Sequence, residues 1–153
     1  MVDRLILDGD GGTTPIAGPV NAQHDGFNVV GTAATETVQV QTGGLVTSFA
    51  ANGDTVQFLG NAGDFTIEAG GGNSITVTGN GQTSTISLNN NIADTASQLQ
   101  FSDGTLDVGV DSSGDSLQIS AGGQTFGEGD TIDPSAGDVT FDDTNTAPDP
   151  IGT

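Results

Sequence analysis

Short runs of alternating apolar and polar residues recur along most of this chain, and turn-forming residues separate them. From Phe27 onward each run is followed by a stretch rich in Gly, Asn or Asp. Alternation with a period of two is typical of a strand with one buried face, because successive side chains point to opposite sides. The pattern predicts strands at 27–30, 37–41, 45–49, 55–59, 65–68, 74–78, 83–88, 98–101, 105–110, 116–120, 124–126 and 139–141.

The spacing of these runs indicates the fold class. Turn signals such as Asn52-Gly53 and Gly122-Gly123 recur roughly every ten residues, and only 92–97 resembles a turn of helix. Many short strands at regular spacing are typical of all-β folds. We therefore expect an all-β protein, a β-sandwich or β-solenoid with Gly/Asn/Asp-rich turns and almost no helix.

The two ends of the chain differ from its middle. A short apolar run at 5–7 precedes a Gly-rich segment with Pro15 and Pro19, and the last twelve residues are acidic and interrupted by prolines. These features predict three parts: a strand on a flexible tether at 1–26, a β domain at 27–141, and an acidic tail at 142–153. The strand at 5–7 is a candidate for addition to a neighbour's sheet.

The clearest hairpin signal lies at 99–110. Leu99 and Phe101 alternate with polar residues, and Leu106 resumes the pattern after Asp103-Gly104. Asp-Gly supplies the positive-φ residues that two-residue hairpin turns require, so we expect these two residues to form the turn.

The charge of the chain limits its partners. Twenty acidic residues face one basic residue, Arg4, which gives a formal net charge of -19. Repulsion excludes nucleic acids and anionic membranes as partners. There is no cysteine, no run of apolar residues long enough to span a bilayer, and no secretory signal at the N-terminus. If the protein is exported, we expect a route that reads no cleaved N-terminal signal.

Aspartates recur at every fourth position just after the hairpin turn begins. Residues four apart share a face of an extended strand, so this row places carboxylates on one side of it. Carboxylate oxygens on turn-rich backbone suit Ca²⁺, which takes six to eight oxygen ligands. The alternative is a solvated acidic face that keeps the protein soluble. The predicted calcium ligands are Asp103, Asp107, Asp111, Asp115, Asp130 and Asp133.

Other candidate sites are incomplete. Asp8-Gly9-Asp10-Gly11-Gly12 begins like an EF-hand loop, but Pro19 stands where the bidentate Glu belongs. His24 is the only histidine, and no nucleophile motif accompanies it. Two-carboxylate glycoside hydrolysis is allowed by the number of acids, but the chain has no Trp or Tyr on which sugar rings stack. We therefore expect a protein that is not an enzyme.

Several phrases in the middle of the chain resemble a group of secreted bacterial proteins. Asn52-Gly53-Asp54-Thr55-Val56, Asp64-Phe65-Thr66-Ile67 and Phe101-Ser102-Asp103-Gly104-Thr105-Leu106 are similar to segments of type I-secreted surface proteins. These include RTX-like, haemolysin-type calcium-binding proteins, adhesins and S-layer proteins, and the resemblance covers roughly 45–125. It implies extracellular or cell-surface location, calcium dependence and self-assembly. The intact nonapeptide repeat of that group is absent, and Gly71-Gly72-Asn73-Ser74-Ile75 is a degenerate form of it.

Together these features predict an extracellular structural protein that assembles with itself, with calcium between acidic surfaces, into a filament, sheath or surface layer. Its partners are copies of itself and other matrix or cell-surface components. The alternative is a calcium-stabilised adhesin or carbohydrate-binding module that acts without polymerising, and a concave site with convergent polar groups would favour it. A third reading is a halophilic protein whose acidity holds its hydration shell.

Overall fold

A computed structural model describes residues 3–6, 12–16, 27–30, 32, 34–40, 46–47, 49–51, 53–71, 73–79, 82–89 and 91–148. The strands are β1 (Asp3–Ile6), β2 (Thr13–Ile16), β3 (Phe27–Val30), β4 (Thr37–Val40), β5 (Val46–Thr47), β6 (Phe49–Ala51), β7 (Thr55–Phe58), β8 (Thr66–Gly70), β9 (Ser74–Gly79), β10 (Gln82–Leu88), β11 (Ser97–Phe101), β12 (Gly104–Asp111), β13 (Gln118–Ala121), β14 (Gln124–Phe126) and β15 (Thr131–Ile132). One 3₁₀ turn, η1 (Ala62–Asp64), lies between β7 and β8. The all-β prediction is confirmed.

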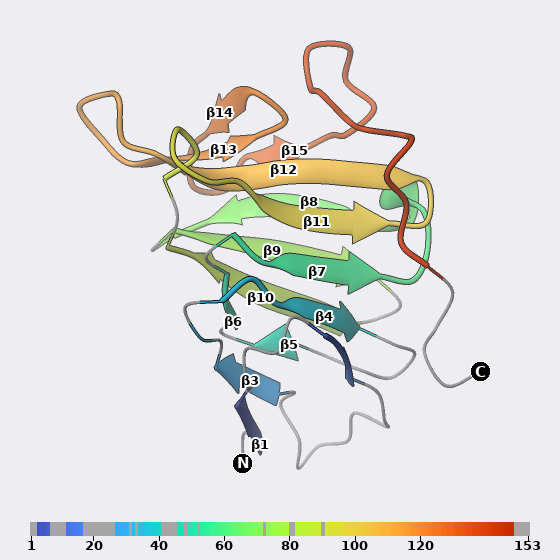
Figure 1. The fold of residues 1–153 in the computed structure, drawn as a ribbon. Coiled ribbons are helices and arrows are strands. Elements are labelled where there is room, and N and C mark those ends of the chain that lie inside the picture. Colours follow the sequence, from blue (N-terminus) through green and yellow to red (C-terminus); the bar gives the residue numbers. More distant parts are fainter. Residues whose placement is uncertain are drawn as a thin grey trace.

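The strands form two layers (Figure 1). The first is a seven-stranded sheet in the order β14-β13-β12-β11-β7-β4-β2. The second combines the sheet β1-β3-β5 with the sheet β15-β8-β9-β10-β6. Residue 48 alone separates β5 from β6, so these two short strands connect the pieces of the second layer.

The N-terminal part of both layers is built as a solenoid. In the first layer β2, β4, β7 and β11 pair in parallel, with Thr13, Thr37 and Thr55 in register. In the second layer β1 pairs in parallel with β3 and β3 with β5, and β6 pairs in parallel with β10. Parallel neighbours need a crossover connection. From β1 to β5 each crossover is one strand of the opposite layer, whereas β7 reaches β11 through β8, β9 and β10.

The C-terminal part changes to antiparallel hairpins. β11-β12-β13-β14 and β8-β9-β10 are successive antiparallel pairs, and β15 closes the second layer beside β8. The protein therefore joins the two architectures that the sequence left open, with solenoid rungs at one end and a hairpin sandwich at the other.

The core lies between the two layers. Inward side chains such as Val56 and Leu99 face Ile75 and Ile86, and each of these is almost fully buried. At the end of the core next to η1, three phenylalanines pack together with ring centroids 5.6 Å apart: Phe58, Phe65 and Phe101. These rings supply much of the bulk that a core without Trp or Tyr would otherwise lack.

Most predicted strands are present within one or two residues of their expected ends. Three differences stand out. The segment 139–141 forms no strand, and only Asp142 makes an isolated bridge, to Thr105. The segment 92–94 is a hydrogen-bonded turn and not a helix. The sequence also missed β2, which contains Pro15, and β15, which has only two residues.

The central hairpin forms, but its turn lies one residue earlier than expected. Phe101 pairs with Gly104, so Ser102 and Asp103 are the turn residues. Among the described non-glycine residues only Asn73 has a positive φ, so Asp103 does not adopt the conformation that we predicted. Gly104 is needed for space instead: a Cβ there would lie 2.5 Å from Cε1 of Phe141.

Both terminal parts contribute to the sheets. β1 and β2 fall within the predicted tether, yet they pair with β3 and β4 and form the first rung of the solenoid. In the predicted tail, Ala147 donates a backbone hydrogen bond to the Phe101 carbonyl at 2.8 Å. Residues 142–148 are therefore part of the fold, whereas 7–11, 17–26 and 149–153 lie outside the described residues.

Candidate functional site

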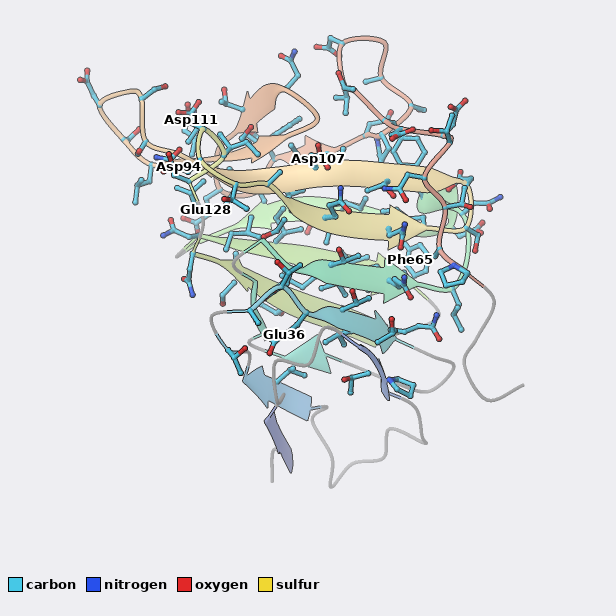
Figure 2. All side chains as sticks on the ribbon, in the orientation of Figure 1. Glu36, Phe65, Asp94, Asp107, Asp111 and Glu128 are labelled. Carbon is cyan, nitrogen blue, oxygen red and sulfur yellow. The ribbon has the colours of Figure 1, made fainter. Side chains whose placement is uncertain are left out.

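The structure distributes the predicted calcium ligands over turns and one strand. Asp107 lies on the exposed face of β12, and Asp111 lies at the end of the same strand (Figure 2). Asp103 occupies the hairpin turn and Asp115 the 112–117 loop, while Asp130 and Asp133 flank β15. Among the described residues there is no group of three or more acidic or histidine side chains that could hold a metal ion. His24 and residues 8–11 lie outside the described part.

Two of the predicted ligands, Asp111 and Asp133, and the further acid Asp142 accept hydrogen bonds from the backbone of their own loops. Asp133 Oδ1 accepts hydrogen bonds from Ser135 N at 2.9 Å and Ser135 Oγ at 2.6 Å. Asp142 Oδ1 accepts from Thr144 N at 3.0 Å and Thr144 Oγ1 at 2.6 Å, and Asp111 Oδ1 accepts from Ser113 N at 2.8 Å. The shared signal is Asp followed two residues later by Ser or Thr, which is the spacing of an Asx turn.

These turns keep the three carboxylates charged. Hydrogen bonds from the hydroxyl and backbone of Ser113 lower the pKa of Asp111, and those from Ser135 lower the pKa of Asp133 in the same way. The Thr144 hydroxyl, followed by backbone hydrogen bonds, lowers the pKa of Asp142. Hydrogen bonds to the ionised form stabilise that form.

Asp103 and Asp130 also have structural partners. Asp103 Oδ1 accepts a hydrogen bond from Ala62 N at 2.8 Å, which ties the hairpin turn to η1. Asp130 Oδ2 accepts from Gly127 N at 2.8 Å within its own turn. One function of the acidic residues is therefore to satisfy the backbone of a turn-rich chain.

A row of amide side chains lies on the face of the solenoid strands that points away from the core. Gln39 donates to Gln57 Oε1 at 3.0 Å, and Gln57 donates to Gln100 Oε1 at 2.8 Å. Gln100 in turn donates to Asn145 Oδ1 at 2.7 Å, so the C-terminal segment continues the row. All three glutamines are buried although they alternate with core residues. We call this row the glutamine ladder.

Two buried acids mark one corner of the solenoid. Glu36, labelled in Figure 2, precedes β4, and its carboxylate accepts hydrogen bonds from Thr32 N at 2.9 and 3.1 Å. Asp54 precedes β7, and its Oδ1 accepts from Glu36 N at 2.8 Å. On the next rung Ser97 Oγ accepts from Gly53 N at 3.0 Å. In both cases a side chain of one rung accepts a hydrogen bond from the backbone of the preceding rung.

A groove lies on the outer surface where β12 passes the C-terminal segment, and we call it the β12 groove. It has a cavity volume of about 410 Å³. Asp107 and Asp142 line it together with Gln98 and Thr140, and Ile92 and Ala96 form an apolar part of its wall. Its other walls include the backbone of Gly122 and Gly123.

The sequence indicated Asp107 as a site residue, but no pattern in it predicted that Asp142 would lie beside Asp107. In the structure Asp142 pairs with Thr105, two residues from Asp107 on the same strand. The backbone bonds between Thr105 and Asp142 are both 2.9 Å long. The two aspartates are 35 positions apart in the chain, and no local pattern predicts that bridge.

Comparisons of the chain with models of known protein families, with curated proteins and with solved structures each find no match. Within the described residues, no helix has the length and apolar character needed to cross a membrane.

Proposed function

We propose that this chain is an extracellular structural protein that assembles with copies of itself, and that the joint is strand addition at the first rung of the solenoid. The observation that carries the proposal is the position of β1 and β2. Each is the last strand of its layer at the same end of the molecule, and each has one partner among the described residues (Figure 1). A strand with one unpaired edge is a template for pairing with another chain.

The opposite end of the molecule is less suited to strand addition. There the layers end in β14 and β15, which have three and two residues. Very short edge strands are one way in which proteins prevent edge-to-edge association. β1 and β2 have four residues each.

The distribution of charge favours the same end. The segment 1–53, which contains β1 to β6, carries five acidic residues and one basic residue, Arg4, and one of these acids, Glu36, is buried. The segment 103–149 carries eleven acidic residues and no basic one. Two copies that meet at their solenoid ends therefore bring less like charge together than copies that meet elsewhere.

Calcium has a supporting part in this proposal. The net charge of -19 opposes any association, and divalent cations between acidic surfaces reduce that repulsion. A joint between two first rungs uses the same surface of both copies and closes as a pair, so a polymer needs a second contact. The exposed carboxylate of Asp115, in the 112–117 loop, lies away from the first rung and is a candidate for a calcium site shared between neighbouring pairs. In this arrangement a complete coordination shell needs oxygens from two copies.

Light scattering with negative-stain microscopy tests the proposal. The titration starts in chelator and raises CaCl₂ to ~10 mM, which exceeds the ~1 mM dissociation constant of the weakest extracellular calcium modules. MgCl₂ and KCl serve as controls. We expect ordered polymer that appears with calcium and dissolves with chelator.

A variant tests the joint itself. Leu5→Pro with Ile6→Pro removes adjacent N–H groups from β1, one on each side of the strand, and should abolish the polymer. Thr125→Pro on β14 is the matched control at the other end, and its polymer should persist. Polymer that survives the β1 change, or a protein that stays monomeric throughout the calcium titration, contradicts the proposal.

A further inference from the structure

We propose that the β12 groove binds an arginine side chain presented by a basic partner segment. This inference does not depend on self-assembly. It rests on three properties of the groove: its two oriented carboxylates, its apolar wall, and its volume of about 410 Å³.

The two carboxylates are held in place by the protein. Gln98 Nε2 donates to Asp107 Oδ1 at 3.1 Å, and Thr144 donates to Asp142 Oδ1 from both its backbone and its hydroxyl. These bonds end on Oδ1 in both residues and fix the orientation of each carboxylate. The lowered pKa of Asp142 means that this carboxylate is charged at neutral pH.

The polar lining favours a ligand that donates hydrogen bonds. Carboxylate oxygens only accept, and the side-chain amide N–H of Gln98 is already directed at Asp107. An anionic ligand would meet both carboxylates and the net charge of -19. A cation is the complementary ligand.

The apolar wall selects among cations. Ile92 and Ala96 face the same groove as the carboxylates. A calcium ion needs six to eight oxygens within about 2.6 Å and gains nothing from an alkyl wall. A long cationic side chain packs its methylene stem on apolar surface and places its charged head among acceptors.

Arginine fits better than lysine. Its planar guanidinium carries five donors in a fixed fork and can engage two carboxylates at once, whereas the lysine ammonium is a compact point charge. The chain itself has only Arg4 as a basic residue, so a basic segment of another protein is the expected source.

The ligand test uses NMR titration of the intact protein with an acetylated, amidated pentapeptide that has one central arginine between glycines. We expect amide shifts at Gly122, Gly123 and Thr140. The same peptide with citrulline keeps the shape and loses the charge, and it should bind at least tenfold more weakly. A lysine peptide should also bind more weakly. Equal binding of the citrulline or lysine peptide overturns the assignment to arginine.

The variant test uses Asp107→Asn with Asp142→Asn. Asparagine retains Oδ1, so the Gln98 and Thr144 hydrogen bonds and the fold should persist. The matched control is Asp138→Asn with Asp143→Asn, which changes the net charge equally at exposed positions that do not line the groove. We expect at least a tenfold loss of affinity for the groove variant and less than a twofold loss for the control. Equal losses overturn the proposal, because they would mean general attraction to an acidic surface.

Discussion

At the scale of single residues, the acids of this chain have two different environments. Asp54 and Glu36 are buried and hold the solenoid corner, whereas most of the other described acids are exposed in loops. From composition alone, all of these acids would be expected on one acidic surface. Their different environments lead to different expected effects of mutation and pH.

Replacing Asp54 should weaken the solenoid corner. Asp54→Ala removes the acceptor of the buried Glu36 N–H, and a buried donor without a partner costs about 1–3 kcal/mol. Urea denaturation followed by circular dichroism measures the loss. Asp54→Asn keeps an acceptor oxygen and should lose less, and Asp94→Ala at an exposed turn should change little. Equal stability of Asp54→Ala and the natural chain would disprove the role of this hydrogen bond.

The turn at Asp142 should respond to acid. Because hydrogen bonds from Thr144 lower the folded pKa of Asp142, the turn's contribution is present above the unfolded pKa of about 3.8 and is lost as pH falls through the lower folded value. The Thr144 amide resonance should therefore titrate with a midpoint below 3.8. Asp142→Asn keeps the turn and should remove that titration. A midpoint at or above the ordinary value contradicts the assignment.

At the scale of strands and turns, alternation located most strands but not what covers them. Leu99, Phe101 and Leu106 are buried, as the pattern predicted. Gln57 and Gln100 fall at the polar positions of the same pattern and are also buried, because the glutamine ladder and the C-terminal segment satisfy their amides. A period of two indicates which face a residue is on, and it carries no information about a later segment that crosses that face.

The glutamine ladder should contribute to stability through its central member. Gln57→Leu has similar volume but removes the hydrogen bond from Gln39 Nε2 to Gln57 Oε1 and the one from Gln57 Nε2 to Gln100 Oε1. Unsatisfied buried polar groups cost about 1–3 kcal/mol each, so we expect a loss of this order or larger in urea denaturation. Gln118→Leu on β13 is exposed and should have little effect. A Gln57→Leu protein as stable as that control would disprove the contribution of the ladder.

Gly104 should be required for the docking of the C-terminal segment. In Gly104→Ala, the new Cβ would lie 2.5 Å from Phe141 Cε1 and 2.7 Å from the Asp142 carbonyl oxygen. We expect faster amide hydrogen exchange at Thr105 and Asp142, whose mutual hydrogen bonds would break. Gly114→Ala meets no atom within 4 Å and serves as the control. Unchanged exchange at both amides would show that the segment does not depend on this close approach.

At the scale of the whole molecule, the sequence predicted an all-β fold and offered two architectures. Both are present, because the strands up to β7 pair in parallel, whereas β8-β9-β10 and β11-β12-β13-β14 form antiparallel hairpins. The β12 groove was not predictable, since Asp107 meets Asp142 only through the bridge to Thr105. Local patterns predicted the strands and several turns, and the contacts between distant segments required the structure.

The net charge should make stability depend on ionic strength. With 20 acidic residues and one basic residue, like charges repel in the folded state more than in the expanded chain. Thermal unfolding should therefore shift to higher temperature as KCl increases. If calcium also fills shared sites, CaCl₂ should raise the midpoint further than KCl at equal ionic strength. Identical curves for the two salts would favour a general screening effect and the halophilic reading.

The change from parallel rungs to antiparallel hairpins also implies an order of events during folding. β11 and β12 are joined by a two-residue turn, whereas Thr55 on β7 meets its partner Gln98 on β11 only after the long β8-β9-β10 excursion. Closing short loops costs less entropy and is faster, so the hairpins should form first and the rungs should add to them toward the N-terminus. The half of the chain that is synthesised last would then be the template on which the earlier half folds.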